Sequence, residues 1–103
     1  MNRQPVRWEF VVRARPPDVG RWLELFDELR PLRIRHGATG HRFLRNMDDP
    51  NDITLVIEFT SRGGARGYAR EVARMVTNRA VGMEGHRGDW QEVLLEPIEV
   101  VRY

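Results

Sequence analysis

The segment from Gly37 to Phe59, GATGHRFLRNMDDPNDITLVIEF, constrains the possible folds more than any other part of the chain. Its second half alternates between an apolar and a mixed set of side chains. The apolar set is Ile53, Leu55, Ile57 and Phe59, and the mixed set is Thr54, Val56, Glu58 and Thr60. A period of two is typical of a β-strand with two different faces. Met47 is followed by Asp, Pro and Asn residues at all of positions 48–52, and these favour a turn. We therefore predict a β-hairpin with arms at 38–45 and 53–60.

Composition limits the class of protein. The chain has 103 residues, which favours one domain spanning 1–103. It contains no cysteine, so disulfides and thiol chemistry are excluded. No apolar run approaches the roughly 20 residues of a membrane span, and the N-terminus lacks a signal-peptide core. We expect a cytoplasmic protein that does not contact membranes. Its basic residues are all arginine and are spread along the chain rather than clustered, so we expect no nucleic-acid partner.

Strands and helices are also predicted on both sides of the hairpin. Alternation predicts a strand over 6–13, with Trp8 and Phe10 on its apolar face. An apolar stripe at helical spacing predicts a helix over 17–35, kinked or ended by Pro31. A second helix is predicted from an N-cap at Ser61 to about residue 81. A long last strand is predicted over 90–103, with a bulge, bend or edge at Pro97.

The element order β-α-β-β-α-β predicts the α+β ferredoxin-like fold. In that fold, two helices cover one face of a four-stranded antiparallel sheet. The other face carries apolar side chains such as Val11 and Val56, and exposed apolar surface of this kind marks an interface. We expect a homodimer joined through this sheet face, which forms a dimeric α/β barrel.

The segment LRIRHGATGHRFLRNMDDPNDITLVIEFTS, together with the preceding RWLELFDELRPLR, resembles the antibiotic biosynthesis monooxygenase (ABM) superfamily of dimeric α/β-barrel proteins. The shared pattern is a helix ending in L-R-x-x-x-G, a strand, D-D-P-N, and an apolar strand ending in E-F-x-S. The resemblance implies the fold over about residues 6–100. It leaves the chemistry open, because the superfamily includes cofactor-free oxygenases, cyclases and haem-degrading enzymes.

Sequence features argue against a cofactor. The first strand lacks the asparagine of haem-degrading relatives, and Tyr68 is the only aromatic residue in the second predicted helix. No glycine motif for binding phosphates adjoins a strand. His36, His41 and His86 do not have metal-ligand spacing. We therefore expect no flavin, haem or metal.

His41 is the main candidate for catalysis. A symmetric hairpin with Asn46 opposite Ile53 would place His41 opposite Glu58 on the mixed face, with Phe43 opposite Val56. Directly opposed side chains lie about 5 Å apart. A histidine beside a carboxylate in a closed barrel is a credible general base, although the same pair could be purely structural. A one-residue slip would move His41 to the helix-facing side.

Other residues are candidates for binding a substrate. Arg7 and Arg13 lie on the mixed face of the first strand, where they could hold an enolate or carboxylate. They could equally be exposed ion pairs of little energetic weight. His86 and Trp90 lie at the loop before the last strand, and loops often carry function. Phe43 and Val56 would line the barrel interior.

Two functions fit these features. The first is a cofactor-free enzyme of ABM type, which oxygenates or cyclises an aromatic or polyketide-like small molecule in secondary metabolism. The second is a non-catalytic small-molecule-binding or structural dimer. The enzyme predicts a deep apolar pocket that contains His41, Glu58 or an arginine, whereas the alternative predicts an interior packed solid by side chains such as Phe43 and Val56.

Overall fold

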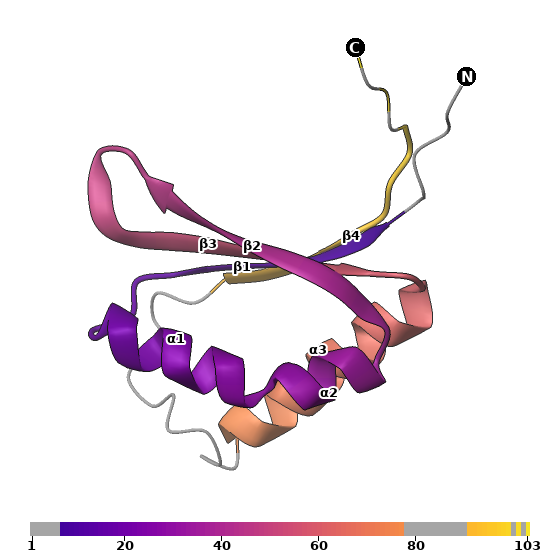
Figure 1. Cartoon of the computed structure of the whole chain (residues 1–103), viewed down its shortest axis with the longest axis horizontal. Coiled ribbons are helices and arrows are strands. Elements are labelled where there is room, and N and C mark those ends of the chain that lie inside the picture. Colours follow the sequence, from indigo (N-terminus) through magenta and orange to yellow (C-terminus); the bar gives the residue numbers. More distant parts are fainter. Residues whose placement is uncertain (1–6, 78–90, 100, 102) are drawn as a thin grey trace.

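The computed structural model describes residues 7–77, 91–99, 101 and 103, with the side chains of 76 and 77 left out. Its elements are β1 (Trp8–Ala14), α1 (Val19–Glu28), α2 (Arg30–Arg35), β2 (Ala38–Asn46), β3 (Asp49–Phe59), α3 (Arg62–Thr77) and β4 (Gln91–Leu95). The strands form one antiparallel sheet in the order β2-β3-β1-β4, and all three helices lie against one face of it (Figure 1). The predicted ferredoxin-like α+β fold is therefore confirmed.

The core lies between this face and the helices. Alternate residues of β1 and β3 point into it, and α1 and α3 contribute large side chains. The main buried side chains are Phe10, Val12, Trp22, Phe26, Leu55, Ile57, Phe59, Tyr68 and Val72. The other sheet face has no helix over it in the described part of the chain (Figure 1). None of the described helices is long and apolar enough to cross a membrane.

The predicted first helix is split in two at Leu29, two residues before Pro31. Asp18 caps α1 by accepting a hydrogen bond from the Arg21 backbone nitrogen at 3.0 Å. Pro31 has no N–H to continue the α1 ladder, and it sits instead in the first turn of α2, where proline is tolerated. Because α2 starts afresh, its own buried residues, Leu32 and Arg33, turn toward the sheet side.

The predicted hairpin register was wrong by one residue. Arg45, not Asn46, pairs with Ile53, so His41 lies opposite Ile57 and Phe43 lies opposite Leu55. The cause is the turn: Asn46 pairs with Asp49 in a tighter loop than predicted, and residues 50–52 are left as an irregularity in β3. Local bonds hold this loop, from the Asp48 nitrogen to the Asn46 side chain at 2.8 Å and from the Asn51 nitrogen to the Asp49 side chain at 3.1 Å.

The last strand is shorter than predicted. β4 ends at Leu95, before Pro97, whose missing N–H cannot join a ladder. Residues 96–99 are described and are not strand. The predicted start at Trp90 lies outside the described residues.

Glycine allows α3 to approach the end of α2 closely. Ser61 caps α3, as predicted, by accepting a hydrogen bond from the Gly64 nitrogen at 3.0 Å. A Cβ atom on Gly64 would lie 2.1 Å from the backbone oxygen of His36, whereas a Cβ on Gly63 would meet nothing within 4 Å. Gly37, with φ +86°, then turns the chain from α2 into β2 in a conformation that side chains disfavour.

Gly64 and Gly63 give a matched test of the packing between α3 and the end of α2. Gly64→Ala should lower the free energy of unfolding by about 1–3 kcal/mol, because the methyl group overlaps rigid backbone. Gly63→Ala should leave stability unchanged or raise it by up to about 1 kcal/mol, since alanine favours helix. Chemical denaturation of both variants measures this, and equal effects would contradict the described approach of α3 to α2.

Candidate functional site

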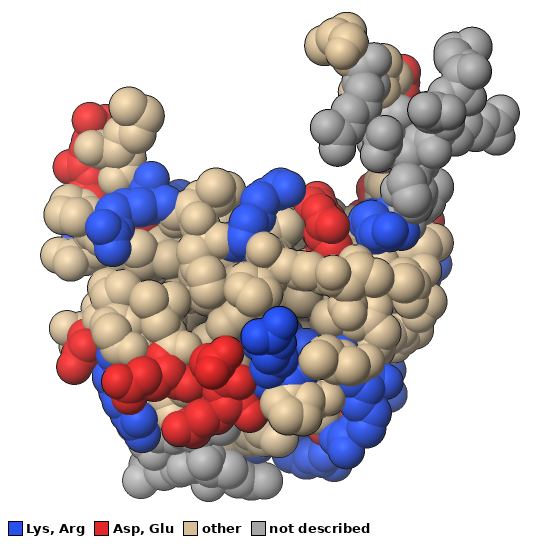
Figure 2. Space-filling model, in the orientation of Figure 1, with Lys and Arg blue, Asp and Glu red and all other residues tan. Residues whose placement is uncertain are grey.

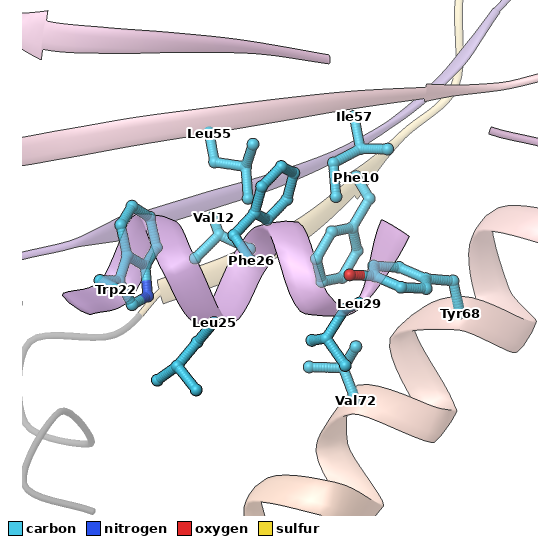
Figure 3. Close-up of a pocket in the computed structure, with 10 residues that line it drawn as sticks. All are labelled: Phe10, Val12, Trp22, Leu25, Phe26, Leu29, Leu55, Ile57, Tyr68 and Val72. Atoms are coloured by element: carbon cyan, nitrogen blue, oxygen red, sulfur yellow. The ribbon is translucent and has the colours of Figure 1, made fainter. Parts of the chain in front are cut away.

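An apolar cavity of about 30 Å³ lies between α1, α3 and the sheet (Figure 3). Its lining residues are Phe10, Val12, Trp22, Leu25, Phe26, Leu29, Leu55, Ile57, Tyr68 and Val72. They come from β1, β3 and the helices, which are the elements that build the core. Only Trp22 and Tyr68 among them carry polar side-chain atoms. The Tyr68 hydroxyl points from α3 across the cavity toward α1 (Figure 3).

Arg33 is the unusual residue beside this cavity. It is only 3% exposed, and its guanidinium carbon lies 3.5 Å from the centre of the Phe26 ring. Its Nη1 donates to the backbone oxygen of Phe26 at 2.5 Å. Its Nη2 is buried without a hydrogen-bond partner, and no described carboxylate forms an ion pair with it. An unpaired buried charge costs roughly several kcal/mol, so this arrangement requires an explanation.

The pKa of the Tyr68 hydroxyl is affected both by burial and by the neighbouring Arg33. Burial raises the pKa of the Tyr68 hydroxyl, while the neighbouring Arg33 guanidinium acts in the opposite direction. The Tyr68 ring packs edge-on against Phe10, with 5.7 Å between ring centres. A fixed hydroxyl next to a buried cation can donate to, or exchange a proton with, an oxygen atom in the cavity.

His41 lies on the helix-facing side of β2, because of the corrected register. Its ring centre is 4.9 Å from that of Phe26 and 5.5 Å from that of Phe43. His41 is exposed and does not line the cavity, whereas Phe26 does. Burial lowers the pKa of His41, and the positive charges of Arg33 and Arg30 lower it further, against a smaller opposing effect of Asp27. The neutral imidazole, which can accept a proton, is therefore favoured near neutral pH.

The predicted pairing of Glu58 with His41 was wrong, because the two side chains are on opposite faces of the sheet. Glu58 lies 3.7 Å from Arg42, which also reaches Glu9 at 3.5 Å. These three residues form an ion network on the helix-free face. Glu58 therefore cannot orient His41 within one chain.

The remaining candidates fall in different places. Phe43 packs in the core with Trp22 and Phe26, rather than opposite Val56, and Val56 is buried on the helix-free face. Arg13 is bound by Asp52 on that same face, with 3.0 Å from Nε to Oδ1 and 2.6 Å from Nη2 to Oδ2. Arg7 precedes β1 and is half-buried. His86 and Trp90 lie outside the described residues.

Sequence reasoning assigned no role to Arg33 or to the hydroxyl of Tyr68. A signal for Arg33 existed: it falls at a core position of α2, next to Leu32, and it is the arginine of the quoted L-R-x-x-x-G pattern. Charged residues are almost never fully buried without a partner, so an arginine at such a position is informative. Among the described residues, no group of three or more His, Asp or Glu side chains could hold a metal ion.

Comparison with solved structures shows what the fold is similar to. SnoaB from Streptomyces nogalater, a cofactor-independent oxygenase, matches with a TM-score of 0.66 and 16% identity, over 95% of this chain and 99% of that one. A protein from Bordetella bronchiseptica, provisionally named an antibiotic biosynthesis monooxygenase, matches with a TM-score of 0.66 and 19% identity, over 93% and 100% of the two chains. A dimeric ferredoxin-like protein from an uncultured marine organism matches with a TM-score of 0.64 and 12% identity, over 95% and 94%.

The fold is thus that of ABM-type monooxygenases and dimeric ferredoxin-like proteins, as the sequence pattern predicted. No family model matches the chain, and no curated protein matches it.

The lowered pKa of His41 predicts a specific pH dependence of stability. Between the ordinary histidine pKa of 6.5 and the lower value in the fold, the unfolded chain binds a proton that the folded chain does not. The free energy of unfolding should therefore fall as pH drops through this window. His41→Gln should remove this part of the fall, as measured by urea denaturation from pH 7.5 to about 5. Parallel curves for the parent and the variant would show that the fold does not depress the pKa of His41.

Proposed function

We propose that this chain is a cofactor-free enzyme of ABM type, which oxygenates or cyclises an aromatic or polyketide-like small molecule. The observation that carries the proposal is the apolar cavity between helices and sheet, with the Tyr68 hydroxyl as a polar group inside it. The expected lining by His41, Glu58 or an arginine is not found, because none of these residues lines the cavity. Apolar lining with few convergent polar groups is typical of small-molecule sites. The likeness in fold to SnoaB, a cofactor-independent oxygenase, supports this class of reaction without a bound cofactor.

His41 is the proposed base. Its neutral form takes a proton from a phenol or an acidic carbon of the substrate, and the resulting anion reacts with oxygen or closes a ring. His41 does not line the cavity, so the proposal requires the Phe26 ring, which contacts His41 and lines the cavity, to move and admit the substrate to the imidazole. Oxygenation balances without an added reductant when one O₂ converts a ring CH₂ to a carbonyl, and the second oxygen atom leaves as water.

A non-catalytic binding or structural role is the second candidate, and the size of the cavity favours it. A volume of about 30 Å³ holds roughly two water molecules. A substrate with fused rings therefore needs α1 or its side chains to move outward. A protein that does not make this movement would be a packed dimer rather than an enzyme.

Activity can be tested directly on fused-ring phenols that carry a ring CH₂, the group that the proposed oxygenation converts to a carbonyl. The purified protein, without added flavin, haem or metal, should consume oxygen or give a product whose mass has gained oxygen or lost water. His41→Ala should lower the rate by about 10²–10⁴-fold, the usual contribution of a general base. Arg45→Gln, an exposed change on the same strand, should leave the rate unchanged. A His41→Ala rate within about threefold of the parent would mean that the histidine is structural.

We also propose a homodimer that buries the helix-free face of the sheet. This face exposes Leu44, Val93 and Leu95, at 47%, 47% and 42%. Together with the Arg42 network, they form a mixed surface of the composition seen in interfaces. A two-fold axis would place the same patch of each copy against the other. The dimeric ferredoxin-like neighbour supports this arrangement.

Light scattering should therefore give twice the mass of one chain at micromolar concentration. Val93→Arg should shift the protein toward the monomer, because it places a charge in the proposed contact. Met47→Arg, at the exposed hairpin tip, is the matched control and should remain dimeric. A parent protein that is monomeric, or a Val93→Arg variant that dimerises as well as the parent, would contradict the proposed interface.

A further inference from the structure

Arg33 carries a charge that nothing in the described part of the chain neutralises. It is 3% exposed and stacked on Phe26, and its Nη2 has no hydrogen-bond partner. The one acceptor of Nη1 is the neutral backbone oxygen of Phe26. A guanidinium offers five N–H donors in a fixed fork, which matches the two oxygens of a carboxylate.

The exposed charges around Arg33 are of both signs (Figure 2). Exposed acidic side chains gather over α1 and basic ones over α2 and the neighbouring surface (Figure 2). The acids of α1, Glu24, Asp27 and Glu28, are exposed, and none forms an ion pair with Arg33. Charges in solvent are screened, whereas a buried charge is screened much less. Arg33 is therefore a preorganised positive centre beside an apolar space.

Two neighbours of Arg33, Phe26 and Tyr68, are lining residues of the cavity. Phe26, under the guanidinium, lines the cavity on the α1 side. Tyr68, whose hydroxyl is close enough to feel Arg33, lines it on the α3 side. Arg33 itself does not line the cavity, so an oxygen atom at this end would meet the Tyr68 hydroxyl directly and the guanidinium donor only once the Phe26 ring moves aside.

We propose that Arg33 and Tyr68 form an anion-binding site, whose ligand is a planar aromatic molecule with an acidic oxygen. The cavity of about 30 Å³ is too small for an aromatic ring, so α1 or its side chains must move outward to admit the aromatic part. A carboxylate, enolate or phenolate oxygen then takes the free donor of Arg33. This inference rests on the proposed function for the location of the ligand, and it adds the charge of the ligand and the residues that recognise it. Arg33 was not among the candidate substrate-binding arginines.

Benzoate and benzamide are suitable probes, since they share a ring and a shape but differ in charge. Chemical-shift titrations of the full chain should show benzoate binding at least tenfold more tightly than benzamide. Arg33→Met should remove this preference, because one charge-assisted hydrogen bond changes affinity by about 10–100-fold. Arg30→Met, an exposed change on the same helix, should keep the preference. Tyr68→Phe should weaken benzoate binding more than benzamide binding, because the hydroxyl donates a stronger hydrogen bond to a charged carboxylate than to a neutral amide oxygen.

Stability separates this role from a structural one. Methionine is a flexible apolar side chain that replaces the aliphatic stem of arginine and carries no charge, so Arg33→Met should melt at the same temperature as the parent or higher. Equal affinity of the parent for the two probes, no binding of either, or an unchanged preference in Arg33→Met would overturn the proposal. If Arg33→Met does not fold, the arginine has a structural role and Tyr68→Phe becomes the deciding variant. The proposal is then overturned if Tyr68→Phe binds benzoate as tightly as the parent.

The enzyme proposal can fail separately. A protein that prefers benzoate through Arg33 but converts no fused-ring phenol refutes the catalytic function and leaves the anion site in place. A protein that converts phenols with no preference for benzoate does the reverse.

Discussion

The contact of Asp52 with Arg13 and Asn46 is the interaction on which the site depends. Arg13 donates to Asp52 through both Nε and Nη2, and the Asn46 side chain donates to the same carboxylate at 3.0 Å. These bonds hold the pKa of Asp52 well below its ordinary value of 3.8. They tie the irregular end of β3 to β1 and to the last residue of β2, at the point where the register of β2 is set. A shift of one residue there would turn every side chain of β2 to the opposite face.

That register determines which groups share the helix-facing side of the sheet. His41 and Phe43 lie there with Phe26, while Arg42 faces Glu9 and Glu58 on the other side. The break before Pro31 has a comparable effect, because it lets α2 turn Arg33 inward. The result is a buried cation and a hydroxyl next to an apolar cavity, with the exposed imidazole of His41 in contact with Phe26, which lines that cavity. Burying an unpaired charge costs roughly several kcal/mol, so a ligand that neutralises Arg33 recovers part of this cost.

The element order, the faces of β1 and β3 and the break near Pro31 were predictable, because they depend on short-range periodicity and on the chemistry of proline. The pairing of His41 was not predictable, since Asn46 and Asp52 fix the register through contacts with a distant strand. The end of β4 at Leu95 follows from Pro97, but the local pattern did not show that the described residues 96–99 would lie outside a strand. The inward direction of Arg33 depends on where α2 restarts, which the apolar stripe of the predicted single helix did not show.

The central claim is that ligands bind between the helices and the sheet, at the side where Arg33 lies. Intermolecular nuclear Overhauser effects from bound benzoate test it most directly, because the methyl groups of the two sheet faces are distinct. The account predicts contacts with Val12, Leu55 and Ile57, which line the cavity. Contacts confined to Val11, Val56 and Val93, on the helix-free face, would contradict it.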